Sequence, residues 1–461
     1  MVGRPDGRPS TTARCALALG LWLVCIVSHG ADLTELYGLA RLNDPTFQGA
    51  QFALQAAVQK EPQAFSALLP ALAATGSEGW TNGSTLYTGT PRVTRGFQGN
   101  DWALQLTQPL YRAQNWIAYQ ESHAVVEQAV AQYAGAEQDL ALRTAQAYFD
   151  VLVAEESIAA ADAQVTAFTE QLNAASRSFK AGVSSVTDVD DARSREALAE
   201  AQREASKGEL DGKRAALEAI VGALPDSLSL LRAGAKVPPP DPPDVATWID
   251  RAKSGSPVVK AAEAADAIAE REYKRTRALR LPTVDLTASY GGNYSSGNII
   301  NPVDYASNVK DRQLNVQVSV PLFDAGGIHA QVAEARARHA KATADVETAR
   351  RQVTVDARQA YAAITSGIVQ IHALEAAIIA GRSAVKGNQA GYGLGIRINS
   401  DVLNAQQQLY GTLRDYAKAR YDALLQGLKL KAAAGALSEA DLRDIDRLFD
   451  EHPPSAIDVI R

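Results

Sequence analysis

Two aspartates occupy equivalent places in a short pattern that this sequence contains twice. Asp188 follows Gly182 in FKAGVSSVTDVDDARSREA, and Asp401 follows Gly395 in YGLGIRINSDVLNAQQQLY, 213 positions later (395 − 182). Glycine commonly ends a helix and aspartate commonly caps the start of one, so each copy predicts a tight turn between two helices. Such residues can provide hydrogen bonding and charge attraction at the end of a helical hairpin.

Residues that carry catalysis or bind metals are not grouped in this chain. The histidines lack a ligand spacing such as HExxH, no serine lies in a nucleophile elbow, and the carboxylates form no evident acid–base pair. Gly391, Gly393 and Gly395 follow a helical pattern instead of a strand, which argues against a phosphate loop. The formal net charge of −6 gives no sign of a nucleic-acid-binding surface. We expect no enzyme, no cofactor, no metal and no nucleic-acid partner, and a hydrolase is the weakest alternative.

The first 30 residues have the composition of a secretory signal peptide. Arg4, Arg8 and Arg14 precede the apolar run CALALGLWLVCIV, and small residues surround the expected cleavage site after Gly30. Both cysteines lie in this segment, so the mature chain is expected to have no disulfide. No later stretch approaches about 20 uninterrupted apolar residues, which predicts no transmembrane helix. The mature protein is therefore expected to be secreted, periplasmic or inserted as a β-barrel.

The mature sequence is an internal duplication. The prolines at 45, 70 and 109 recur 212 positions later (257 − 45), and after a one-residue shift the glycine–aspartate pattern recurs at 213. The two repeats cover 31–235 and 245–435, and the proline-rich linker KVPPPDPPD (236–244) joins them. A tail follows at 436–461.

Each repeat contains a long stretch without proline that favours helices. An apolar period of 3.5 residues extends from Leu140 to Leu172 and again from Val353 to Val385, which predicts coiled-coil packing. The first long helix would measure about 100 Å. We expect Gly182 and Gly395 at the helix ends, and Thr187, Ser400 or the aspartates beside them as caps of the return helices. The expected long helices cover about 113–179 and 328–391, and the return helices about 188–222 and 400–435.

Before each long helix the apolar period changes to two, which is typical of strands. In TVDLTASY and QLNVQVSV, apolar and polar residues alternate, and long polar loops rich in Gly, Asn and Ser join the strand pairs. The expected strands cover about 70–80, 101–111, 282–292 and 312–323. The smallest membrane barrels need about eight strands, so four strands predict that several copies share one barrel.

An ordered series of motifs resembles the TolC family of outer-membrane exit ducts. QPLY and VPLF end two expected strands, RTAQAYFDVL and DARQAYAAI lie in the long helices, and YGLGIRINSDVLNAQQQLY contains the second turn. The resemblance implies an α+β membrane protein, mostly α, that forms a homotrimer. Each chain would give four strands to a shared twelve-stranded β-barrel in outer-membrane lipid. The helices would build a long periplasmic barrel with a mixed α/β equatorial region.

The resemblance also implies partners and a function. Such ducts work with an inner-membrane ABC transporter or other pump and a periplasmic adaptor. Type I secretion of a cyclolysin-like protein toxin is the expected role, and a multidrug efflux duct is the alternative. A soluble coiled-coil adaptor or scaffold is a more distant alternative, because it leaves the alternating strands unexplained.

For the repeated turns, the resemblance implies a gate at the periplasmic aperture. Tyr392 and Arg397 match the residues of an inner hairpin that bond to an aspartate of an outer hairpin. Asp188 matches that aspartate, and Thr187 lies beside it. Release of these bonds would dilate the aperture.

Asp401 matches an acidic residue that lines the pore constriction in the family. Asn404 stands where a second aspartate is often found, which leaves the strength of cation binding open. Ordinary explanations exist for the same residues: Asp188 and Asp401 as helix caps, Arg397 as an exposed surface charge, and Tyr392 as a packing residue.

Overall fold

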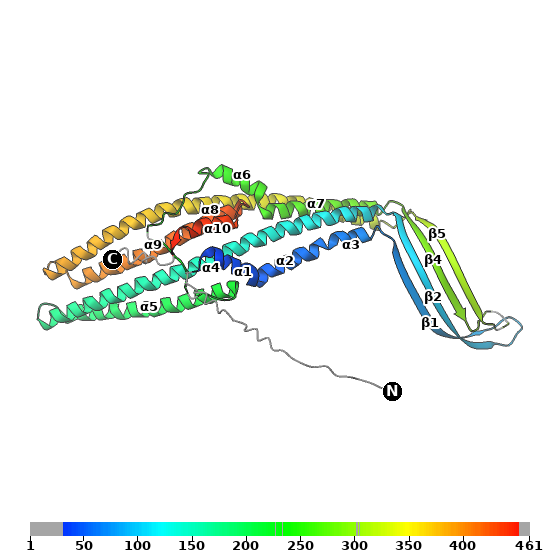
Figure 1. Cartoon of the computed structure of the whole chain (residues 1–461), viewed down its shortest axis with the longest axis horizontal. Helices are drawn as coiled ribbons and strands as arrows, with labels where there is room; N and C mark the ends of the chain where they lie inside the picture. The colour runs from blue at the N-terminus through cyan, green and yellow to red at the C-terminus, as the bar shows by residue number, and fades with distance from the viewer. Residues whose placement is uncertain (1–30, 226, 233, 301–302, 304, 451–461) are drawn as a thin grey trace, which may run out of the picture.

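The computed structural model describes residues 31–225, 227–232, 234–300, 303 and 305–450, so the predicted signal peptide (1–30) and the end of the predicted tail (451–461) lie outside them. The described chain is elongated, with a sheet at one end and two helical hairpins at the other (Figure 1). Its elements are α1 (Leu33–Asn43), α2 (Pro45–Val58), α3 (Lys60–Ser66), β1 (Ala71–Thr85), β2 (Val93–Tyr111), α4 (Ala113–Lys180), α5 (Val186–Val221), β3 (Leu230–Leu231), α6 (Val245–Gly255), α7 (Pro257–Ala278), β4 (Thr283–Ser295), β5 (Ser307–Ser319), α8 (Gly327–Gly393), α9 (Asn399–Ala433), α10 (Glu439–Asp446) and β6 (Phe449–Asp450).

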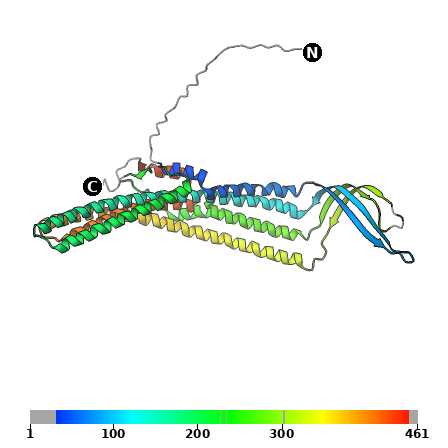
Figure 2. The same ribbon diagram turned by 90° about the horizontal axis from the view of Figure 1, so that it is seen from below.

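The predicted apolar seams lie inside the helical hairpins. In α4, Leu140, Thr144 and Val151 are fully buried, and in α8, Ala357 and Ile364 are also buried. α4 packs on α5 and α8 packs on α9, while α9 also contacts α4, so the two hairpins lie side by side (Figures 1 and 2). A 3.5-residue period keeps the seam positions on one face of each helix, which is why it predicted this packing. Small residues at many of these positions allow the helices to approach closely.

The sheet joins the two repeats through its central strands. Its order is β1-β2-β4-β5 and every neighbouring pair is antiparallel. The first hairpin is longer than predicted, because the Gly-, Ser- and Thr-rich residues up to Thr85 and from Val93 pair as strands. β5 ends at Ser319, before the predicted end at 323, because Pro321 has no N–H to donate to a ladder. Within the described chain, β1 and β5 each have one unpaired edge.

One face of the sheet is apolar and exposed in the single chain. The register places Leu106 opposite Ala288 and Ala288 opposite Leu314, so the apolar positions of adjacent strands share a face. On the same face, the rings of Trp102 and Tyr290 meet edge to face with centroids 5.2 Å apart. The exposed fraction reaches 72% for Leu314. Exposed apolar area of this extent marks a surface that contacts lipid or another protein.

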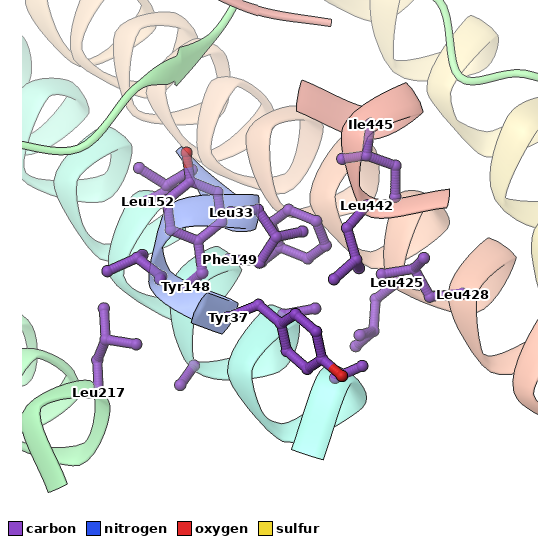
Figure 3. Close-up of a cluster of buried hydrophobic side chains, with 14 of the residues drawn as sticks. Leu33, Tyr37, Tyr148, Phe149, Leu152, Leu217, Leu425, Leu428, Leu442 and Ile445 are labelled. Atoms are coloured by element: carbon purple, nitrogen blue, oxygen red, sulfur yellow. The ribbon is translucent and has the colours of Figure 1, made fainter. Parts of the chain in front are cut away.

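The main core lies near the middle of the molecule, where both ends of the described chain meet. Tyr148 and Phe149 of α4 pack against Phe449, and Tyr421 of α9 lies beside them (Figure 3 shows Tyr148 and Phe149 from this cluster). The Tyr148 hydroxyl donates to the Ser229 carbonyl at 2.7 Å. Leu442 and Ile445 of α10 cover this core together with α1. The part of the predicted tail that contains α10 and β6 therefore covers this core.

One helix differs from the expectation that no helix could span a membrane. α8 contains an 18-residue window with mean hydropathy 1.5, of which 17% is buried in the single chain, although a few polar residues interrupt it. Val369 and Ile379 are exposed on this helix, with 69% and 70% of their surfaces accessible. A search for uninterrupted apolar residues does not find this window of α8, because small and polar residues are interspersed in it. A single window of this kind is weak support for a membrane helix.

Candidate functional site

The two repeated turns lie next to each other at the end of the molecule opposite the sheet (Figure 1). Gly182 has φ of +76° and Gly395 has φ of +71°, the left-handed conformation that glycine adopts without strain. The backbone N–H of Gly182 donates to the Phe179 carbonyl, and that of Val183 donates to the Ser178 carbonyl. The second turn has the same two bonds, so both hairpins end in a Schellman motif. Each glycine therefore lies just past the end of its long helix.

The predicted caps are right only in part, because Asp188 takes part in the cap of α5 but neither N-cap residue is one that was predicted. α5 begins at Val186, and its N-cap is Ser185, not Thr187 or Asp188. Asp188 is the third helical residue and completes a capping box with Ser185. α9 begins at Asn399, and its N-cap Ile398 provides no side-chain hydrogen bond. A serine three residues before an aspartate is a capping-box signal that is present in the sequence.

The gate candidates of the outer hairpin lie at its exposed end. Thr187 is exposed, and its hydroxyl donates to the Ser185 hydroxyl at 2.8 Å. Asp188 is half-buried, and its carboxylate accepts from the Ser185 N–H at 3.3 Å. This long bond leaves most of the hydrogen-bonding capacity of the carboxylate available.

The gate candidates of the inner hairpin make different contacts. Among the described residues, the recorded ion pair of Arg397 is with Asp401 on the same hairpin, at 3.6 Å, and not with Asp188. The Tyr392 hydroxyl is buried and has no hydrogen-bond partner within the described chain. Tyr392 lines an open cleft of about 430 Å³ between α4, α8 and α9. Asn404 is exposed. The single chain thus does not bring Arg397 and Asp188 into an ion pair.

Other polar residues connect the two hairpins directly. The Asn399 side chain donates to the Asp188 carbonyl at 3.0 Å and accepts from the Gln171 amide at 2.6 Å. The Ser400 hydroxyl donates to the Asp191 carboxylate at 2.8 Å. These residues could not be identified from the sequence, because a polar residue at the start of a helix is ordinarily exposed and nothing local shows which distant helix it faces.

An apolar cluster lies on the same helices as these bonds. Leu403 of α9 is fully buried and packs among Phe168, Val189 and Ala192 of the outer hairpin. Hydrogen bonds in such surroundings are stronger than in water, and an unpaired polar group there is costly. The arrangement can therefore hold one hairpin against the other.

The comparison with known families agrees with this architecture. The chain matches the outer membrane efflux protein family over residues 36–223 and 248–436, one match for each repeat. The chain belongs to this family, whose members are outer-membrane channel proteins and not enzymes. The protein accordingly resides in the outer membrane and extends into the periplasm. The predicted TolC resemblance, fold class and localisation are confirmed.

Individual relatives cover most of the chain. The outer membrane protein TolC of Escherichia coli strain K12 is 29% identical over 428 residues, which are 90% of this chain and 84% of that protein. The alkaline protease secretion protein AprF of Pseudomonas aeruginosa is 30% identical over 415 residues, 89% of this chain and 85% of that protein. Protein CyaE of Bordetella pertussis is more distant, at 24% identity over 329 residues, 70% of this chain and 68% of that protein.

Solved structures share the fold. A crystal structure of CusC superposes with a TM-score of 0.74 at 18% identity and covers 88% of this chain and 93% of that one. The outer membrane protein VceC of Vibrio cholerae gives 0.72 at 18% identity and covers 87% of this chain and 96% of that one. These likenesses establish the fold of the described chain.

Proposed function

We propose that this protein is the outer-membrane duct of a tripartite export machine and works as a homotrimer. The observation that carries the proposal is the four-stranded sheet, which has an unpaired edge on β1 and another on β5. Unpaired edges are sites of further strand pairing, and four strands are too few to close a membrane barrel. Three copies that pair β5 of one with β1 of the next would close a twelve-stranded barrel.

The faces of the sheet suit this assembly. The apolar face that carries Leu72, Leu314 and Val316 would contact outer-membrane lipid. The opposite face carries Asp101, Gln105 and other polar residues and would line a water-filled lumen. Contact between copies would also cover exposed apolar residues of α8 such as Val369 and Ile379, which lie outside its buried seam.

The cargo proposed for this duct is a protein exported by type I secretion, with an inner-membrane ABC transporter and a periplasmic adaptor as partners. The name of one relative supports this choice, since AprF is a protease secretion protein and matches most of the chain. The family description names efflux, which supports the second candidate, an outer-membrane factor of a multidrug efflux pump.

At the periplasmic end, we assign Asp188, Thr187, Tyr392 and Arg397 to the gate. The support is the placement of both turns at the same tip and Tyr392 itself, whose hydroxyl has no partner within the described chain and which lines an open cleft. Asp401 is assigned to the pore constriction, with Asn404 one turn further along α9.

Two measurements test the duct. Native mass spectrometry of the detergent-purified protein should give three copies per particle, and the particle should conduct ions in a planar bilayer. A stable monomer that needs no detergent would contradict the proposal. The cargo is tested in a strain that lacks its own duct, where restored protease or toxin secretion supports type I export and restored drug resistance supports efflux.

A further inference from the structure

Asn399 has an unusual position for an amide side chain at the start of a helix. It is the first residue of α9, yet its exposed fraction is 0%. Its two amide atoms contact both helices of the outer hairpin: Oδ1 accepts from Gln171 of α4 at 2.6 Å, and Nδ2 donates to the Asp188 carbonyl of α5 at 3.0 Å. One side chain therefore connects three helices.

The internal duplication shows that this position differs between the two hairpins. The counterpart of Asn399 in the first repeat is Val186 (399 − 213), which is 52% exposed at the start of α5. α5 begins with a capping box, whereas α9 begins at Asn399 and its N-cap residue, Ile398, provides no side-chain hydrogen bond. The start of the outer hairpin's return helix is thus stabilised locally, and that of the inner hairpin depends on bonds to its neighbour.

The surroundings determine how these bonds act. Gln171 is 7% exposed, and the apolar cluster with Leu403 and Phe168 lies beside the pair. Separation of the hairpins would break both bonds, and water would then satisfy the freed amide groups. The bonds are therefore strong while the hairpins are closed and are replaceable when they part.

We propose that Asn399 is a positioning residue of the gate, which latches the inner hairpin to the outer hairpin of the same chain through Gln171 and the Asp188 carbonyl. This inference rests on the proposed duct function. Asn399 would act in addition to the gate residues Tyr392 and Arg397, and its contact lies within one chain. It bonds to the backbone carbonyl of Asp188 and not to the carboxylate.

The test is single-channel recording of the purified full-length trimer in planar bilayers. A net hydrogen bond is worth about five-fold in an equilibrium, so Asn399→Ala should raise the ratio of high-conductance to low-conductance time about ten-fold or more. Val186→Ala, the matched change in the first repeat, should leave the ratio unchanged. Gln171→Ala should raise the ratio about five-fold. The double variant should have the same ratio as Asn399→Ala alone, because both changes remove the bond between Asn399 and Gln171.

The outcomes separate the latch from the duct. If the wild-type protein carries no current, the duct function fails. If the wild type conducts, the comparison is made with Asn399→Ala as an intact trimer of unchanged unfolding temperature. A ratio of high-conductance to low-conductance time within two-fold of the wild-type ratio then shows that the latch is wrong. A double variant equal to the product of the single effects also overturns the latch. Should Asn399→Ala not assemble, Gln171→Ala decides alone, since it keeps Asn399 and removes the bond between them.

Discussion

Replacement of Tyr392 with phenylalanine removes one buried oxygen atom. Whether the channel then opens more or less often shows whether that oxygen has a hydrogen-bond partner in the closed trimer. The hydroxyl is buried and has no partner within the described chain. If the closed trimer supplies a partner, such as the Asp188 carboxylate of the gate, Tyr392→Phe loses a hydrogen bond worth about 1 kcal/mol and opens the channel about five-fold more often. If the closed trimer supplies none, the change removes an unsatisfied buried group and closes the channel further.

Our proposal predicts the first result. Single-channel recordings of Tyr392→Phe should show an increase of about five-fold in the time spent at high conductance, with the trimer mass unchanged. Tyr273→Phe makes the same chemical change on α7 and should have no effect. A Tyr392→Phe channel that opens less than the wild type would refute a hydrogen bond of Tyr392 in the closed gate.

Three further substitutions test separate parts of the molecule. The exposed pair of Arg397 with Asp401 is worth under about 0.5 kcal/mol, so an increase in open time beyond about two-fold in Arg397→Ser would reveal a second partner in the trimer. Asp401→Ala should shift the reversal potential in a salt gradient toward lower cation preference, and an unchanged potential removes Asp401 from the constriction. Asp44→Ala removes a buried carboxylate that pairs with the half-buried Arg143 at 2.8 Å and caps a helix. It should lower the free energy of unfolding by about 2 kcal/mol in denaturant titrations, against under about 0.5 kcal/mol for the exposed Asp139→Ala.

The Asp44 pair also predicts a dependence on pH. Burial raises the pKa of Asp44, but hydrogen bonds from Arg143 and the Phe47 N–H outweigh it and hold the pKa below its ordinary value. Asp44 therefore contributes stability above the ordinary pKa of an aspartate, and this contribution is lost as the pH falls through the lowered pKa. The stability difference between wild type and Asp44→Ala should accordingly shrink in acid.

The sequence predicted the features that depend on periodicity. The seam from Leu140 onward and the alternation around Leu314 each follow from burial of one face, which repeats along an element regardless of distant partners. The turn glycines were also predictable, because the left-handed conformation at Gly182 and Gly395 selects glycine locally.

Features that depend on which distant residues meet could not be predicted in the same way. Asn399 and Gln171 are 228 positions apart, and their bond requires the relative rotation of two hairpins to be known. The cap at Ser185 was missed for a different reason, since serine, threonine and aspartate adjoin one another there and all can cap a helix. The ends of β1 and β2 could not be predicted, because their Gly- and Ser-rich residues have low strand propensity and pair through the partner strand that lies opposite.

The central pairing of β2 with β4 joins strands from different repeats, and a β5–β1 contact between copies would do the same. An ancestral gene with a single repeat could therefore have closed a similar tube from six identical units, each with an identical tip. Fusion of two units into one gene would allow alternate tips to differ, as Val186 and Asn399 do. In the proposed gate, half of the rods would stay fixed while the other half move, which no arrangement of six identical chains permits without breaking its own symmetry.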